Sequence, residues 1–218
     1  MTKYLSHKLL VLLLAFLPFQ VMAVQEDWKE ASAVIEQATE RMLAMMKDET
    51  LLQEANRDQL LGEVENIVEE VIDFEHFARR VMGRYVRTAT DEEIQRFADT
   101  IKSTLMRTYS LAMVGFEVRS YSISPPRAPS PEPGMQVVNV TVTSGDGQSF
   151  ELLYYMLKQE SGWKLVNVMV DGINLRITFR NQFADMYQRS RSIGAVIDSW
   201  EERIAGAVEE VLNGDAEG

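Results

Sequence analysis

The chain of 218 residues is 46% hydrophobic and 9% aromatic, a composition typical of a globular protein and not of a disordered one. Its 33 acidic residues outnumber its 22 basic ones, and the resulting net charge of −11 disfavours binding to nucleic acid or to anionic membrane surfaces. The absence of cysteine excludes disulfide bonds, cysteine nucleophiles and cysteine-ligated metals.

The N-terminus has the pattern of a secretory signal peptide. Lys3 and Lys8 supply a positive start, an apolar run extends from Leu9 to Phe19, and Val21-Met22-Ala23 forms a small-residue cleavage site. A membrane anchor is the alternative, but the run is shorter than the roughly 20 residues that span a bilayer. We therefore predict that the chain is exported and then cleaved after Ala23.

Cleavage divides the chain into a signal peptide, residues 1–23, and a single mature domain, residues 24–218. The signal peptide contains two of the basic residues and none of the acidic ones, so the mature net charge is −13. The mature length is enough for one domain with a sizeable core. Without disulfides, packing of that core has to supply the stability.

Apolar residues spaced by three and four predict amphipathic helices over residues 28–45, 60–72 and 74–82. Thr90-Asp91-Glu92-Glu93 has the form of a capping box and predicts the start of a long helix. Two more helices are expected near the C-terminus, over residues 175–186 and 193–211. Four acids on the second helix are expected to be simply solvated: Glu63, Glu65, Glu69 and Glu70.

Between these helical regions, β-branched and aromatic residues predict four strands. The strands cover residues 116–123, 135–143, 150–157 and 163–170. Short polar turns join the last three, which predicts an antiparallel meander. The tract 124–134 holds five of the six prolines; a domain linker is possible, but a surface loop within one sheet is favoured.

The strands carry more apolar surface than a half-exposed sheet requires, so helices have to cover it. A solid core is the default interpretation, while the many Met and Tyr side chains are typical of an adaptable apolar pocket. Alternation places Val166, Val168 and Val170 on one face of the fourth strand and Trp163, Leu165 and Met169 on the other.

Few residues are suited to catalysis. The mature chain has one histidine, His76, which cannot build a histidine-rich metal site, and no Gly-x-Ser-x-Gly or phosphate-binding loop is present. Asp171 ends an apolar strand and is the best candidate for an acid or base, although an Asp before Gly is more often turn chemistry. We expect no catalytic residue, metal or cofactor.

Two blocks of the chain carry a family pattern. They are Phe77-Ala78-Arg79-Arg80-Val81-Met82-Gly83-Arg84-Tyr85, and Gly162-Trp163-Lys164-Leu165-Val166-Asn167-Val168 followed by Asp171-Gly172-Ile173-Asn174-Leu175. On these blocks the chain resembles the MlaC-type periplasmic phospholipid-binding proteins, also called the toluene-tolerance auxiliary family. The resemblance implies an α+β fold of nuclear-transport-factor-like shape, in which a helical layer and a four-stranded antiparallel sheet enclose an apolar pocket.

The resemblance also implies a function. It suggests a monomeric periplasmic carrier that holds phospholipid as cargo and maintains outer-membrane lipid asymmetry. The implied partners are an outer-membrane lipoprotein and porin complex and an inner-membrane ABC transporter with an MCE-domain subunit. An isomerase or dehydratase on the same fold, or a periplasmic chaperone for apolar segments, are the alternatives.

The expected lipid-contacting residues combine one sheet face, the long helix that begins near Thr90, and the matched blocks with the helix that follows them. They are Tyr85, Tyr109, Met113, Val140, Tyr154, Met156, Val168, Val170, Phe179 and Phe183.

The first prediction concerns processing. The exported protein should begin at Val24, because signal peptidase recognises the small residues at Val21 and Ala23. Intact-mass spectrometry of protein from a periplasmic extract measures this, and Ala23→Arg should block cleavage. A secreted chain that keeps residues 1–23 would contradict the prediction and favour the membrane anchor.

Overall fold

The computed structural model describes residues 17–113, 117–126, 130 and 132–212, and the side chains within 26–107, 117–126, 130 and 132–204. The helices are α2 (Leu17–Met46), α3 (Arg57–Val71), α4 (Phe74–Met82), α5 (Asp91–Met113), α6 (Leu175–Ser190) and α7 (Ile193–Leu212), with short 3-10 turns at Glu54–Asn56 and Gly83–Arg87. The strands are β1 (Val118–Ser124), β2 (Met135–Ser144), β3 (Ser149–Gln159), β4 (Gly162–Val170) and β5 (Ile173–Asn174).

The strands form one antiparallel sheet in the order β1-β2-β3-β4-β5, which confirms the α+β class and the predicted meander. The structure adds the two-residue strand β5, which pairs with the end of β4. Because β1 pairs directly with β2, the proline-rich tract connects neighbouring strands of one sheet, as expected, and does not link two domains.

A β-bulge in β4 corrects the predicted faces of that strand. The register shifts between Tyr155 and Met156 of β3, so that Tyr155 opposes Asn167 while Met156 opposes Leu165. Val166 is the extra residue, and an extra residue reverses the alternation on either side of it. Trp163 and Leu165 therefore share a face with Val168, where alternation had placed them on opposite faces.

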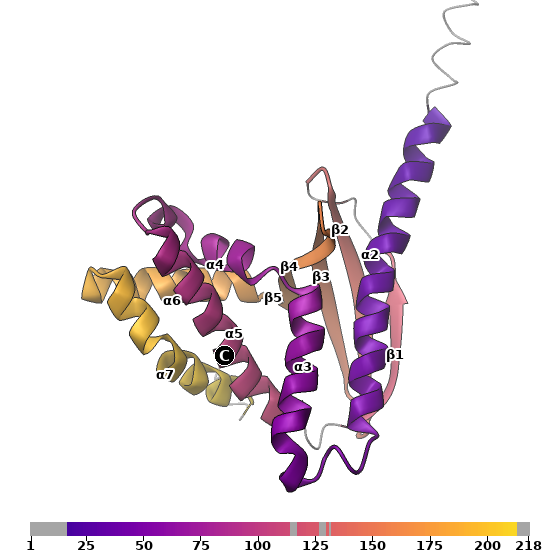
Figure 1. The fold of residues 1–218 in the computed structure, drawn as a ribbon. Coiled ribbons are helices and arrows are strands. Elements are labelled where there is room, and N and C mark those ends of the chain that lie inside the picture. The colour runs from indigo at the N-terminus through magenta and orange to yellow at the C-terminus, as the bar shows by residue number, and fades with distance from the viewer. Residues whose placement is uncertain (1–16, 114–116, 127–129, 131, 213–218) are drawn as a thin grey trace, which may run out of the picture.

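The helices divide into two groups (Figure 1). Helices α2 and α3 lie side by side against one face of the sheet, whereas α4, α5, α6 and α7 gather beside it. The capping box predicted at the start of α5 is present, with Thr90 N–H donating to Glu93 Oε2 at 2.9 Å and Glu93 N–H donating to Thr90 Oγ1 at 3.1 Å. Helix α5 packs on α3, α4 and α7, so the helices over the sheet are α2 and α3 and not α5.

Each group has its own hydrophobic cluster. The sheet cluster joins α2 and the end of α3 to the strands through Ala31, Ile35, Val71, Val138, Val140, Met156, Trp163 and Leu165. The helical cluster joins α4, α5, α6 and α7 around Phe97, Phe183 and Trp200. The rings of Phe97 and Trp200 meet edge to face, with their centroids 4.8 Å apart. The buried surface of the fold is thus divided between two centres.

Polar contacts hold α2 on the sheet. Trp28 Nε1 donates to the carbonyl of Val137 at 3.1 Å, and Trp163 Nε1 donates to Glu30 Oε2 at 3.1 Å. Lys158 pairs with Asp27 at 2.8 Å and with Glu30 at 3.1 Å. The hydrogen bond from Trp163, which has the largest effect, and the one from Lys158 lower the pKa of Glu30. All of these contacts lie after residue 23, so they would survive the predicted cleavage.

Three of the four acids expected to be solvated on α3 instead form ion pairs. Lys102 of α5 contacts Glu69 at 2.7 Å and Glu65 at 3.0 Å, and Glu70 pairs with Arg41 of α2. Because these pairs join helices far apart in sequence, periodicity within one helix could not reveal them.

Truncating the helical cluster should destabilise the protein. Phe183 is fully buried between Phe97 and Trp200, and its ring centroid lies 5.1 Å from that of Phe97. Phe183→Ala should lower the free energy of unfolding by about 3–5 kcal/mol. Urea unfolding followed by circular dichroism measures this. Ile173→Ala, at a side chain 54% exposed, is the control and should change stability by less than about 0.5 kcal/mol.

Candidate functional site

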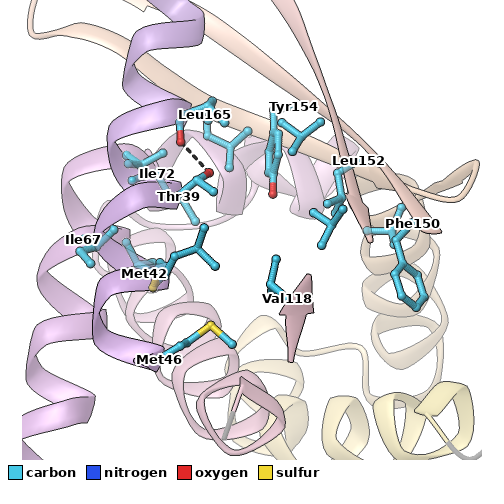
Figure 2. A pocket seen from close by; sticks show the side chains of 18 residues that line it. Thr39, Met42, Met46, Ile67, Ile72, Val118, Phe150, Leu152, Tyr154 and Leu165 are labelled. Atoms are coloured by element: carbon cyan, nitrogen blue, oxygen red, sulfur yellow. Dashed lines mark hydrogen bonds between the residues drawn. The ribbon is translucent and has the colours of Figure 1, made fainter. Parts of the chain in front are cut away.

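An apolar cavity of about 530 Å³ lies between the sheet and the two helices that cover it (Figure 2). Its volume falls within the range of about 300–1,000 Å³ usual for small-molecule sites. The lining side chains come from α2, α3 and four strands: Ile35, Ala38, Thr39, Met42, Leu43, Met46, Ile67, Val68, Val71, Ile72, Val118, Val140, Val142, Phe150, Leu152, Tyr154, Leu165 and Val170.

Strand register explains the sheet wall of the cavity. Val140 of β2 opposes Leu152 of β3, and Leu152 in turn opposes Val170 of β4. Opposed residues in an antiparallel pair point to the same face, so the three side chains form a row across the sheet. β-branched residues suit such a pleated, half-covered surface. The wall is therefore a direct product of the alternating sequence.

The helical wall comes from the second half of α2 and from α3. Met42 and Met46 of α2 and Ile67 and Ile72 from α3 and its C-terminal end face the sheet residues across the cavity (Figure 2). Methionine is unbranched and adapts its shape to a partner. This wall can thus adjust to apolar ligands of different shape.

Two hydroxyl groups lie in this apolar surrounding. Thr39 Oγ1 donates to the carbonyl of Ile35 at 2.8 Å, one turn back along α2. The Tyr154 ring lines the cavity, and burial raises the pKa of its hydroxyl to about 12. Among the described residues, no group is within hydrogen-bond distance of that hydroxyl. Tyr154 therefore offers the cavity one neutral, unpaired donor.

The structure separates eight of the ten expected contact residues into three sets. Val140, Tyr154 and Val170 line the cavity. Met156 and Val168 belong to the sheet cluster next to it, and Tyr85, Phe179 and Phe183 lie in the helical cluster. The side chains of Tyr109 and Met113 lie outside the described part of the structure.

The helical wall of the cavity was not predicted from the sequence. The apolar faces of residues 28–45 and 60–72 were recognised as helices, but helical periodicity does not tell which helix lies over which sheet face. The methionines at 42, 45 and 46 were the available signal, since three in five residues is unusual for a rigid core.

The titratable groups weighed for catalysis lie elsewhere. Asp171 is exposed in the turn between β4 and β5, where its carboxylate accepts a hydrogen bond from the Glu151 N–H at 2.8 Å. That position is the turn chemistry expected for an Asp before Gly. His76 lies on α4, where burial lowers its pKa. Of the described residues that line the cavity, Tyr154 is the one with a titratable side chain.

Neither a metal site nor a membrane-spanning helix is found among the described residues. No group of three or more potential ligands among them could hold a metal ion. No helix within the same residues is long and apolar enough to cross a bilayer.

The fold and cavity define a class: an α+β protein with an apolar cavity between an antiparallel sheet and a helical pair. Residues 36–202 match the MlaC protein family, and the chain belongs to that family. It is 30% identical over 210 residues to the toluene tolerance protein ttg2D of Pseudomonas putida. The aligned region covers 95% of this chain and 94% of the relative.

A solved structure shares the fold. The phospholipid-binding protein from Ralstonia solanacearum, in complex with a phospholipid, matches with a TM-score of 0.71 and 29% sequence identity. The match covers 81% of this chain and 98% of that one. The family resemblance carried by the two sequence blocks is confirmed.

The Tyr154 hydroxyl should make stability fall at alkaline pH. Its folded pKa is about 12 against an ordinary 10.0, so the unfolded chain ionises first and is favoured as pH rises from about 10 to about 12. Wild type should lose about 1–1.5 kcal/mol more than Tyr154→Phe between about pH 8 and about pH 11. Urea unfolding at both pH values measures this. Parallel losses in the two proteins would show that Tyr154 is solvated.

Proposed function

We propose that this protein is a soluble periplasmic carrier that binds a phospholipid by its acyl chains and shuttles it between the two membranes. The observation that carries the proposal is the apolar cavity, where the lining residues that the structure describes include no carboxylate, imidazole or amine for acid or base catalysis. The phospholipid in the Ralstonia solanacearum relative supports the choice of ligand.

The size of the hydrophobic effect explains why a carrier is needed. Two acyl chains hold about 30 methylenes, and at about 0.8 kcal/mol each their exposure to water would cost roughly 25 kcal/mol. An apolar enclosure removes most of that cost during transit. In this proposal the cavity of about 530 Å³ takes the acyl tails, its walls adjust around them, and the headgroup stays outside.

Charge determines how lipid is exchanged in this proposal. With a net charge of −13 after the predicted cleavage, the protein is repelled by anionic bilayers, so it should not collect lipid by adhering to them. Partner proteins then hand lipid over, and the family resemblance supports an outer-membrane lipoprotein and porin complex and an inner-membrane ABC transporter. The signal sequence supports the periplasm as the place of exchange.

The cavity should contain phospholipid in protein purified from a periplasmic extract. We expect about one molecule per chain, because an apolar cavity of this size excludes water and gains contacts when an apolar ligand fills it. Organic-solvent extraction and mass spectrometry identify the contents. A co-purified peptide would favour a chaperone, and a small polar metabolite would favour an enzyme.

A cavity-filling variant tests the location of the ligand. Ala38 of α2 lines the cavity, so Ala38→Trp should place an indole in the space of the acyl chains and reduce co-purified phospholipid several-fold. Ala195→Trp, at an exposed position of α7, is the matched control and should retain a full complement. Circular dichroism confirms folding of both. Full phospholipid in a folded Ala38→Trp protein would place the lipid elsewhere.

A further inference from the structure

Three arginines meet on the side of the molecule where α4 and α6 lie together. Arg80 comes from α4, and Arg176 and Arg180 come from the first half of α6. They line two neighbouring cavities of about 400 Å³ and about 220 Å³, and Arg80 and Arg176 contribute to both. Arg80 and Arg180 are exposed, and Arg176 is half-buried.

These arginines lack acidic partners within the described part of the structure. No carboxylate there lies within 4.0 Å of their guanidinium groups, and the nearest polar contact is from Arg80 Nε to His76 Nε2 at 3.3 Å. Glu132 lines the smaller cavity and attracts Arg176 without pairing with it. The pKa of Arg176 is lowered mainly by its burial, and further by the positive charges of Arg80 and Arg180.

Such a cluster is unexpected in so acidic a protein. Elsewhere the basic residues that join helices or hold α2 have carboxylates within reach, as Lys102 has Glu65 and Glu69. Even Arg79, which adjoins Arg80, contacts Glu75 at 2.7 Å. Like charges that repel one another destabilise the folded chain unless something binds them. The cluster therefore has a cost that stability alone does not explain.

Exposed apolar side chains accompany the arginines. Among the described side chains, the exposed large hydrophobic residues are Ile173, at 54%, and Ile177, at 40%. Ile177 lines the larger cavity with the arginines, and Ile173 lies just before the start of α6. A small inorganic anion would pair with the arginines but gain nothing from contact with an isoleucine. A protein segment with both acidic and apolar side chains would contact the arginines and Ile177 together.

The cluster lies on the far side of the sheet from the lipid cavity. Tyr155 and Asn167 line the smaller arginine cavity, while Tyr154, the neighbour of Tyr155 in β3, lines the lipid cavity. Successive residues of a strand point to opposite faces. Bound cargo in the apolar cavity therefore does not cover the arginines, and they stay available while lipid is carried.

We propose that Arg80, Arg176, Arg180 and Ile177 form the docking site for an acidic segment of a membrane-protein partner, an inference that rests on the proposed carrier function. Carboxylates of the partner pair with the guanidinium groups, which bind them in two-pronged fashion. An apolar side chain of the same segment covers Ile177. The segment enters the two cavities, which a flat bilayer surface cannot do.

Charge reversal tests the proposal on the full-length protein. Labelled protein is mixed with sonicated envelope vesicles of the source bacterium, which present both faces of both membranes, and bound protein is measured by flotation. Arg80→Glu/Arg180→Glu should weaken binding by at least about tenfold. Arg119→Glu/Arg203→Glu changes the net charge equally at exposed arginines on β1 and α7 and should bind like wild type. Binding by wild type should also fall as salt is raised.

Further experiments distinguish a protein partner from a lipid surface and from a second copy of the chain. Protease treatment of the vesicles should abolish binding, and vesicles of extracted lipid without protein should bind neither wild type nor variant. Equal binding by the two double variants, or the same loss on protein-free lipid, overturns the proposal, and so does a wild type that fails to bind. Self-association of wild type that Arg80→Glu/Arg180→Glu removes would assign the site to a second copy of the chain and also overturn it.

Two measurements keep this test independent of the carrier function. Thermal melting shows whether the double variant folds, and Arg80→Gln/Arg180→Gln, with a smaller loss expected, replaces it if it does not. Phospholipid content is determined on the same samples and should equal that of wild type. Absence of lipid from every sample would refute the carrier, whereas normal lipid content with undiminished vesicle binding would refute the docking site alone.

Discussion

Helix α2 is fastened to the sheet near residues 27–31 and lines the cavity over the sheet further along. At the fastened end, Trp28 and Glu30 hydrogen-bond to the strands, and Ala31 is fully buried. From Ala38 to Met46 the same helix lines the cavity. Because one end is held, the apolar face of the sheet is covered without being filled, and the cavity depends on this difference.

A second hydrophobic centre makes that hollow possible. The helical cluster around Phe97, Phe183 and Trp200 supplies close-packed buried surface that does not involve the apolar cavity. Stability of the chain can rest on those contacts, since interiors gain by dense packing. The sheet side can then have a looser, Met-rich wall, whose contacts the bound lipid would complete in the proposed carrier.

Part of the cavity was predictable from local pattern. Alternation along β2 and β3 correctly placed Val140 and Tyr154 on one face, because a side-chain period of two is a property of the strand itself. The same rule was wrong for Trp163 and Leu165, since the bulge at Val166 depends on how β3 and β4 pair. Phe179 and Phe183 fit an apolar helix face, but their neighbours come from α4, α5 and α7.

The sequence by itself determined the elements: the helical and strand periods, the capping box at Thr90, the turn at Asp171 and the family pattern of its two blocks. These are local properties, fixed by residues a few positions apart. Only the tertiary structure decided that α2 and α3 cover the sheet, that Lys102 joins α5 to α3, and that Arg80 meets Arg176 and Arg180. Those contacts join residues that are distant in the chain, and no local pattern encodes which distant surfaces meet.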